Sequence, residues 1–262
     1  MDLLNITHKV VDLAKEIGEF IRIERKTFSY TKVEIKGLND LVSYVDKTSE
    51  QKLVEKLSLI LPEAGFIVEE NTKSGTKDYN WIVDPLDGTT NFIHGIPCYA
   101  ISIALEHQGD IIVGVVYEVA QNECFYAYKN GGAFLNGTKI SVSERNKLSD
   151  SLIATGFPIY NFSRLDNYIK TLTYLMKNTH GLRRIGAAAA DLCYLACGRV
   201  DAFFEYNLNA WDVAAGGLIV KEAGGTVSDF TKSNDWLFGK EIIATNSLLQ
   251  HTMEEIVSEN FK

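Results

Sequence analysis

The chain has 262 residues, with 34 Asp and Glu against 26 Lys and Arg and a formal net charge of −8. A hydrophobic fraction of 46% can fill the core of one large domain or two small ones, which excludes a disordered chain. The acid excess argues against a general nucleic-acid or anionic-membrane binder, because both functions need a basic surface.

The N-terminal residues give no sign of a secretory signal, since they have neither a basic n-region nor an unbroken apolar h-region. Apolar runs such as 111–116 are far too short to span a membrane. The four cysteines are too few for a disulfide framework in a chain of this size, so free thiols in the core are expected at Cys98, Cys124, Cys193 and Cys197. These features predict a soluble cytoplasmic protein.

Two helices are predicted near the N-terminus. Apolar residues recur at steps of three and four from Ile6 to Phe20, which indicates a helix with one buried face. A second helix is expected from 44 to 61, where Pro62 would end it.

The segment 99–140 is predicted to be an antiparallel meander. Its apolar stretches are separated by turn sequences such as Asn130-Gly131 and Asn136-Gly137. Asn-Gly pairs supply the positive φ angles that tight hairpins need.

Beyond Ser141 the pattern changes to helices that alternate with short strands. The helices are expected at 161–178, 187–197 and 213–223. We therefore predict two halves, an antiparallel N-terminal half at 1–145 and an α/β half at 146–262, with the boundary near 144–149.

Three short apolar strands run directly into acidic residues. The strands at 66–68, 81–83 and 202–204 are followed by Glu69, Asp84 and Glu205 respectively. Ligand sites in α/β sheets gather at strand ends, although acids there can also mark the exit of a strand into water. For one strand the exit is the better interpretation, but three together favour a site.

The segment DPLDGTTN at 84–91 strengthens that interpretation. Pro85 cannot donate a ladder hydrogen bond, so the strand is expected to break directly after Asp84. Gly88 allows close backbone approach, and the following Thr, Thr and Asn are good residues for opening a helix. Asp84 and Asp87 would then lie on a stiff turn beside backbone N–H groups. Such acids without His or Cys partners favour a hard cation such as Mg²⁺ over zinc.

Two more helix starts could contribute to a site. Asp212 lies in the first turn of one helix, and Gly186 precedes the alanine run of another. Taken alone, Asp212 is more typical of a helix cap and Gly186 of a turn.

These segments together resemble the signatures of the inositol monophosphatase family. DPLDGTTNFIHGIP at 84–97 resembles the first signature, and WDVAAGGLIVKEAGG at 211–225 resembles the second. NDLVSYVD at 39–46 and VEEN at 68–71 match in the expected order. The resemblance implies an α-β-α-β-α sandwich of the inositol monophosphatase and fructose-1,6-bisphosphatase type, and usually a homodimer. It also implies Mg²⁺-dependent, lithium-sensitive hydrolysis of a small phosphorylated polyol or sugar, without a nucleic-acid or membrane partner.

The resemblance assigns two to three Mg²⁺ ions to each active site. Glu69, Asp84 and the Leu86 carbonyl would hold the first. Asp84, Asp87 and Asp212 would hold the second, with a weaker third near Glu69.

The resemblance also assigns catalytic and substrate-binding residues. Glu69 and Thr89 would position and activate the attacking water, and Asp46 would orient the Thr89 hydroxyl. The N–H groups of Gly88 and Thr89 would receive the phosphate. The expected substrate contacts are Glu69, Leu86, Asp87, Gly88, Thr89, Gly186, Ala187, Ala188, Glu205 and Asp212.

Two departures leave the preferred substrate open. Ala187 stands where Thr or Ser is frequent in the family, and Ser43 replaces a common Thr. Besides myo-inositol 1-phosphate, the candidates are fructose 1,6-bisphosphate, NADP, phosphoadenosine phosphate and histidinol phosphate. His94 could contact the substrate, although a role in structuring its loop is favoured. The pair at 183–184 could serve an interface or the mouth of the site, and a solvated pair at a subunit edge is preferred.

Three competing functions are weaker. A haloacid-dehalogenase site would need two aspartates two residues apart, whereas Asp84 and Asp87 are three apart. Cys193 and Arg199 satisfy the bare Cys-x5-Arg pattern of cysteine phosphatases, but the residues between them continue an apolar helical stripe. A non-catalytic regulatory binding protein on the same scaffold is disfavoured, because the full set of expected metal ligands is present.

Overall fold

The structure is a computed structural model that describes residues 1–29, 33–37, 40–73, 75–158 and 161–261, with backbone only at 33–37 and 40–42. Within the segment NDLVSYVD, Asn39 lies outside the described residues, and the side chains of 40–42 are not described. A short hairpin, β1 (Val33–Gly37) and β2 (Asp40–Ser43), leads into helix α2.

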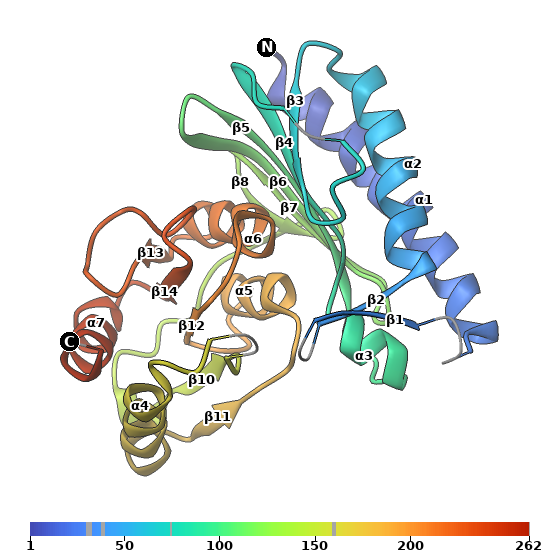
Figure 1. Ribbon diagram of the computed structural model, residues 1–262. Coiled ribbons are helices and arrows are strands. Elements are labelled where there is room, and N and C mark those ends of the chain that lie inside the picture. Colours follow the sequence, from blue (N-terminus) through green and yellow to red (C-terminus); the bar gives the residue numbers. More distant parts are fainter. Residues whose placement is uncertain (30–32, 38–39, 74, 159–160, 262) are drawn as a thin grey trace.

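Five layers make up the fold (Figure 1). Helices α1 (Leu3–Thr27) and α2 (Tyr44–Ile60) cover one face of a seven-stranded sheet. Helices α5 (Ala188–Ala196) and α6 (Ala210–Glu222) separate this sheet from a five-stranded one. Helices α4 (Leu165–Asn178) and α7 (Gln250–Asn260) cover the outer face of the second sheet. The predicted α-β-α-β-α sandwich is therefore confirmed.

The larger sheet has the order β3-β4-β5-β6-β7-β8-β9, and all its neighbours except β3 and β4 pair antiparallel. Its strands are β3 (Gly65–Val68), β4 (Tyr79–Asp87), β5 (Ala100–His107), β6 (Asp110–Glu118), β7 (Glu123–Tyr128), β8 (Gly132–Leu135) and β9 (Thr138–Ile140). The predicted meander is confirmed, and Asn130 and Asn136 adopt the expected positive φ of 63° and 49°.

The smaller sheet has the order β11-β10-β12-β14-β13. Strand β10 pairs parallel with both neighbours, whereas β14 pairs antiparallel with both. Its strands are β10 (Leu152–Thr155), β11 (Gly181–Arg183), β12 (Ala202–Tyr206), β13 (Thr226–Ser228) and β14 (Glu241–Thr245). The predicted mixture of helices and short strands is confirmed, although α4 begins four residues later than expected and α6 three residues earlier.

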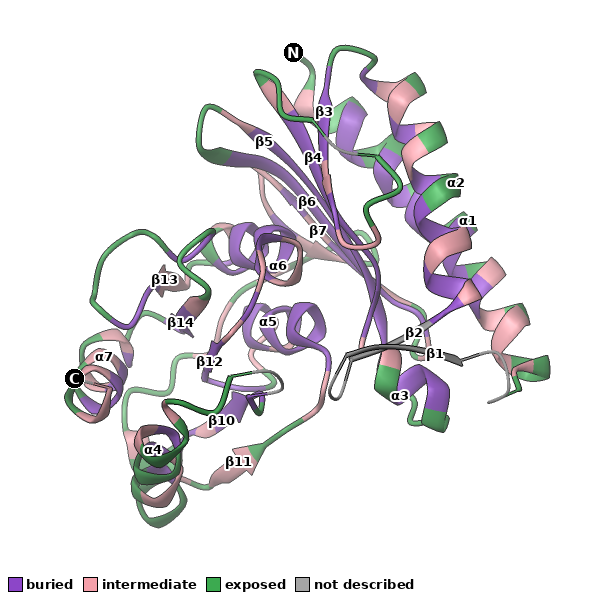
Figure 2. Ribbon diagram, in the orientation of Figure 1, coloured by how far each residue is buried: buried purple, intermediate pink, exposed green. Residues whose placement is uncertain are grey.

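Helices α5 and α6 are buried along most of their length, as Figure 2 shows. Their apolar residues join one cluster with buried residues of both sheets, for example Ile82 and Phe125 from the first and Phe203 from the second. The two halves of the chain therefore share a continuous core. Within the described residues, no helix is both long enough and apolar enough to cross a membrane.

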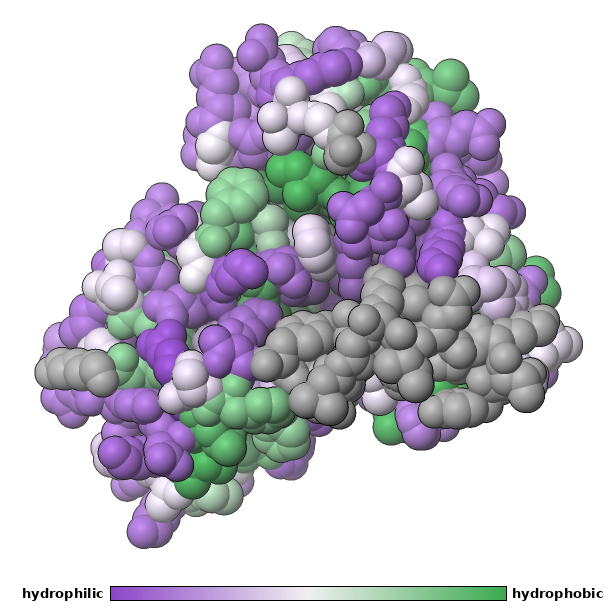
Figure 3. Space-filling model, in the orientation of Figure 1, coloured by the Kyte–Doolittle hydropathy of each residue, from purple (hydrophilic) through white to green (hydrophobic). Residues whose placement is uncertain are grey.

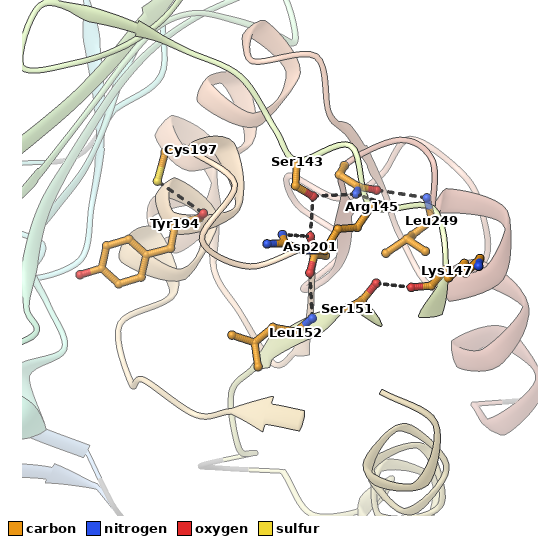
Figure 4. A network of polar contacts seen from close by, with 10 residues as sticks. Ser143, Arg145, Lys147, Ser151, Leu152, Tyr194, Cys197, Asp201 and Leu249 are labelled. Atoms are coloured by element: carbon orange, nitrogen blue, oxygen red, sulfur yellow. Dashed lines mark hydrogen bonds and ion pairs between the residues drawn. The ribbon is translucent and has the colours of Figure 1, made fainter. Parts of the chain in front are cut away.

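A hydrogen-bonded junction holds the link between the two sheets (Figure 4). The fully buried carboxylate of Asp201 accepts hydrogen bonds from the Ser143 hydroxyl, from Arg145 at 2.9 Å and from the Leu152 N–H at 2.8 Å. The Asn246 amide donates to Ser143 Oγ and to the Arg145 carbonyl. The expected division between residues 145 and 146 falls within this fixed link.

Candidate active site

One cavity of about 140 Å³ collects the strand ends and helix starts that the sequence singled out. Ends of β3, β4 and β12 meet the first residues of α3 (Thr89–His94), α5 and α6 there. Asp46 lies behind Thr89 rather than in the wall. The wall includes every other predicted site residue, namely Glu69, Asp84, Leu86, Asp87, Gly88, Thr89, Gly186, Ala187, Ala188, Glu205 and Asp212.

Strand β4 does not end at Asp84, so the predicted break at Pro85 is wrong. Asp84 pairs with Ser102, the register then shifts across the proline, and pairing resumes between Asp87 and Ala100. The missing N–H of Pro85 interrupts the ladder locally, while pairing on either side continues the strand. Similarly, Glu205 lies inside β12 rather than after it. Glu69, by contrast, follows β3 as predicted.

The turn after β4 orients Thr89. Gly88 caps α3 with a φ of 85°, a left-handed conformation that favours glycine, so the predicted helix start is confirmed. The Thr89 hydroxyl lies 2.9 Å from Asp46 Oδ1 and 3.0 Å from the Leu86 carbonyl oxygen. Asp46 Oδ2 accepts hydrogen bonds from the N–H and from the hydroxyl of Ser43. Ser43 and Asp46 together form the capping box of α2. Ser43 thus supplies the hydroxyl that a threonine would supply.

Helix starts position two of the other carboxylates. Asp87 Oδ2 accepts a hydrogen bond of 2.7 Å from the Ala189 N–H in the first turn of α5. Asp212 Oδ2 accepts one of 2.6 Å from the Asn209 N–H and closes the capping box of α6. Asp212 is therefore both a helix cap and part of the cavity wall, so the two interpretations of this residue are compatible.

Glu205 stands over the backbone of Gly156, where a Cβ would lie 2.0 Å from the Glu205 carboxyl. Only glycine at this position leaves room for the carboxyl. The close approach places Glu205 in the cavity wall beside Gly156.

Burial and mutual repulsion dominate the electrostatics of the cavity. Burial raises the pKa of Asp84 well above its usual range, and the neighbouring carboxylates of Glu69, Asp87 and Asp212 raise it further. Burial followed by the charge of Asp87 also raises the pKa of Asp212 well above normal. The pKa of Asp87 is raised to about 6 by burial, although backbone N–H groups of α5 oppose the shift. Burial and Asp87 raise the pKa of Glu205 to about 8.

The cavity wall offers carboxylate oxygens, which are the ligands that a hard divalent cation prefers. Glu69, Asp84, Asp87 and Asp212 are oxygen donors in one cavity. Burial, followed by repulsion from neighbouring carboxylates, raises the pKa values of Asp84 and Asp212, and a cation would relieve that repulsion. The side chains do not form a closed ligand set, because no three Asp, Glu, His or Cys residues in the described part of the chain converge closely enough to hold a metal. The carboxylates would therefore have to close around an ion as it binds.

Several residues of the cavity region were not expected as site residues, and three of them bear on its geometry. Asp191 lines the wall and is 1% exposed. It follows Ala187 by four residues, so helical spacing could have placed it on the same face of α5. The buried Asn91 amide donates to the carbonyls of Cys98 and Ile185 at 2.8 and 2.9 Å, which ties α3 to the loop before α5. Phe157 is the third residue, and its contact is with Arg184.

Arg183 and Arg184 were considered for an interface or for the mouth of the site, and the structure places the two residues differently. The Arg184 guanidinium lines the cavity and lies 5.4 Å from the centroid of the Phe157 ring. Arg184 is exposed, as expected of a solvated residue, and it also lies at the mouth of the site, which was the other role considered. Arg183 is exposed and donates to the Leu182 carbonyl. His94 is exposed at the end of α3 and is not part of the wall.

The cysteines are free, as predicted, and none forms a phosphatase loop. Cys193 is fully buried in α5, and burial raises the pKa of its thiol well above the usual range. Arg199 pairs instead with Glu123. A thiol that stays protonated is a poor nucleophile.

We therefore expect Cys193→Ser to keep kcat for phosphate release within about twofold of wild type, because serine preserves the small buried side chain and the thiol takes no part. The measurement is steady-state turnover with Mg²⁺, and circular dichroism checks that the variant is folded. Loss of turnover in a folded variant would overturn the assignment of chemistry to the carboxylates.

Comparison with known proteins supports the fold and the family. The model of the inositol monophosphatase family matches residues 2–260. A protein of Neisseria meningitidis serogroup B named putative Nus factor SuhB is 43% identical over 247 residues, which are 94% of this chain and 95% of the relative. An inositol-1-monophosphatase of Mesorhizobium japonicum is 40% identical over 259 residues, which cover 98% and 96%. The solved structure of an IMPase from Thermotoga maritima has a TM-score of 0.89 at 35% identity and covers 99% of this chain and 98% of that one. The chain therefore belongs to the inositol monophosphatase family.

Proposed function

We propose that the chain hydrolyses a small phosphate monoester in a Mg²⁺-dependent reaction, with myo-inositol 1-phosphate as the first expected substrate and water as the nucleophile. The observation that carries the proposal is the Thr89 hydroxyl, which is hydrogen-bonded to Asp46 at the edge of a cavity whose wall includes six acidic residues. Family membership supports a phosphomonoesterase. The Mesorhizobium relative named inositol-1-monophosphatase favours a polyol substrate.

The carboxylates and one backbone carbonyl would hold the cations. Glu69, Asp84 and the Leu86 carbonyl would bind one Mg²⁺, and Asp84, Asp87 and Asp212 a second, with a weaker third near Glu69. Bound Mg²⁺ lowers the pKa of water and stabilises negative charge on the leaving oxygen. Two or three ions also add a formal charge of about +4 to +6, enough to reverse the repulsion between the wall and a phosphate.

The residues around Thr89 would prepare the nucleophile. Asp46 and the Leu86 carbonyl share the hydrogen of the Thr89 hydroxyl, so the Thr89 oxygen is free to accept a hydrogen bond from water in the cavity. Glu69 lines the same wall and would accept the proton that the water loses. The N–H groups of Gly88 and Thr89, at the start of α3, would receive the phosphate oxygens.

Four further wall residues would hold the leaving alcohol, namely Gly186, Ala187, Ala188 and Glu205. Ala187 has no hydroxyl, so recognition at this position depends on the backbone. We accordingly keep fructose 1,6-bisphosphate, NADP, phosphoadenosine phosphate and histidinol phosphate as alternative substrates.

A homodimer remains the expected assembly. Large apolar side chains are exposed in and before α4, including Phe157, Phe162, Leu165 and Ile169. Figure 3 shows apolar side chains gathered on this part of an otherwise mostly hydrophilic face. Such a patch supports contact with a second copy of the chain.

A Nus-factor role is the second candidate, because the Neisseria relative carries that name. A binding role of this kind would place no demand on the metal-binding carboxylates or on Thr89. The two functions are compatible in one chain, so the test has to measure hydrolysis directly.

We expect phosphate release from myo-inositol 1-phosphate with Mg²⁺ and none with excess EDTA, because the carboxylates alone repel a phosphate. The assay measures inorganic phosphate and includes the four alternative substrates. Restored activity after Mg²⁺ is added back controls for irreversible damage by the chelator. Inactivity toward every substrate of the panel would favour the binding role.

A further inference from the structure

Asp191 is a buried acid that the proposed mechanism does not use. It lies on α5, where its N–H donates a hydrogen bond of 3.0 Å to the Ala187 carbonyl. Asp191 is therefore one helical turn after Ala187, which is one of the expected substrate contacts. It is 1% exposed, yet it forms part of the cavity wall beside Glu205. It is therefore placed toward the leaving alcohol rather than among the proposed metal ligands.

One oxygen of the Asp191 side chain has no hydrogen-bond partner among the described residues. This atom, Oδ1, is buried. Burial raises the pKa of Asp191 well above normal, and the charges of Glu205 and Asp87 raise it further. Arg184 is the one cation that opposes this shift. A buried acceptor without a partner destabilises a fold, so a native protein that keeps one usually does so for a ligand or for water.

We infer that Asp191 is a further substrate-binding residue, which accepts a hydrogen bond from a hydroxyl of the leaving alcohol next to Glu205. The inference rests on the proposed function and adds a contact to the same cavity. A carboxyl group in a cavity wall can accept a hydrogen bond from an O–H donor.

The charged residues of the cavity wall also indicate which class of substrate the cavity would prefer. Arg184 is the single cationic residue among the described residues that line the cavity, against six acids. The six acids are Glu69, Asp84, Asp87, Asp191, Glu205 and Asp212. Four of them are the proposed metal ligands, which leaves Asp191 and Glu205 to face the leaving alcohol. Two carboxyl groups offer acceptors to hydroxyl donors but no positive charge to a second phosphate. The preferred substrate is therefore a monophosphate whose alcohol carries free neighbouring hydroxyls, and fructose 1,6-bisphosphate is disfavoured.

The test compares Asp191→Leu, Asp191→Asn and wild type on two substrates. For myo-inositol 1-phosphate we expect Asp191→Leu to raise KM by roughly 10- to 100-fold, the range for one lost hydrogen bond to a charged group. Asp191→Asn keeps one acceptor oxygen and should lose less. For p-nitrophenyl phosphate, whose leaving group has no neighbouring hydroxyls, the effect should be smaller, so the ratio of the two kcat/KM values should fall. The control is Asp166→Asn, an exposed acid on α4, for which the ratio should not change.

Thermal stability distinguishes a substrate-binding role of Asp191 from a structural role. Removal of an unpartnered buried acid should leave the Tm of the ligand-free variants unchanged or raise it, whereas a structural residue would lower it. Added myo-inositol should raise the Tm of wild type and not that of Asp191→Leu. This second measurement decides the role of Asp191 even if wild type hydrolyses no phosphate ester, an outcome that would refute the proposed function alone. An unchanged kcat/KM ratio and an unchanged Tm response in Asp191→Leu would overturn the inference.

Discussion

Asp84→Asn should lower kcat by about a thousandfold or more while the fold survives, because asparagine removes a charge shared by both proposed cation positions. Asp84 Oδ1 accepts the Leu86 N–H at 2.9 Å, and the asparagine oxygen can accept the same bond. Glu69, Asp87 and Asp212 all disfavour the ionised form of Asp84. The variant without metal should therefore be at least as stable as wild type.

The experiment measures kcat over a Mg²⁺ titration, together with the Tm without metal. Asp78→Asn is the matched control, since Asp78 precedes β4, is exposed and does not line the cavity. It should retain wild-type turnover. Near-wild-type kcat for Asp84→Asn at saturating Mg²⁺ would show that Asp84 is not a metal ligand.

Thr89→Val should reduce kcat by roughly a hundredfold or more, because valine has a similar shape but cannot hold the attacking water. Among the described residues, the hydroxyl has two hydrogen-bond partners, Asp46 and the Leu86 carbonyl, at 2.9 and 3.0 Å. Its loss should leave KM closer to wild type than kcat, since the phosphate is expected to bind backbone N–H groups. The measurement is the separate change in kcat and KM for myo-inositol 1-phosphate.

A double-mutant cycle with Asp46→Asn tests whether Asp46 acts through Thr89. If it does, the double variant should lose little more turnover than Thr89→Val alone, because the two residues work as a unit. Asp46 also caps α2 through Ser43, so the Tm must be measured for each variant. Fully additive losses in turnover would mean that Asp46 does not orient the hydroxyl.

Several parts of the fold followed from local chemistry. The period of apolar residues predicted α1 and α2, although α1 extends to Thr27 rather than ending near Phe20. Asn-Gly turns predicted the meander because the positive φ they favour is a property of two adjacent residues. Local reasoning failed at Pro85, where the pairing of Asp84 with Ser102 and of Asp87 with Ala100 carries β4 past the proline. The partner strand, rather than the proline, decided where β4 ends.

The sequence by itself determined the family, and it named the residues that we propose to bind a cation and a phosphate. The spacing within 84–97 and 211–225 was sufficient, because each signature gathers its acids and helix start in one short segment. Every residue predicted for the cavity wall lies in it.

Only the tertiary structure decided the environment of the substrate side. Asn91 reaches the Ile185 carbonyl across 94 residues of chain, and Arg184 lines the cavity over Phe157. Asp191 became a candidate only when its Oδ1 was found buried without a partner in a wall shared with Glu205. Burial and the absence of a hydrogen bond depend on all the groups packed around an atom. Segments distant in the chain supply those groups, so no local pattern encodes them.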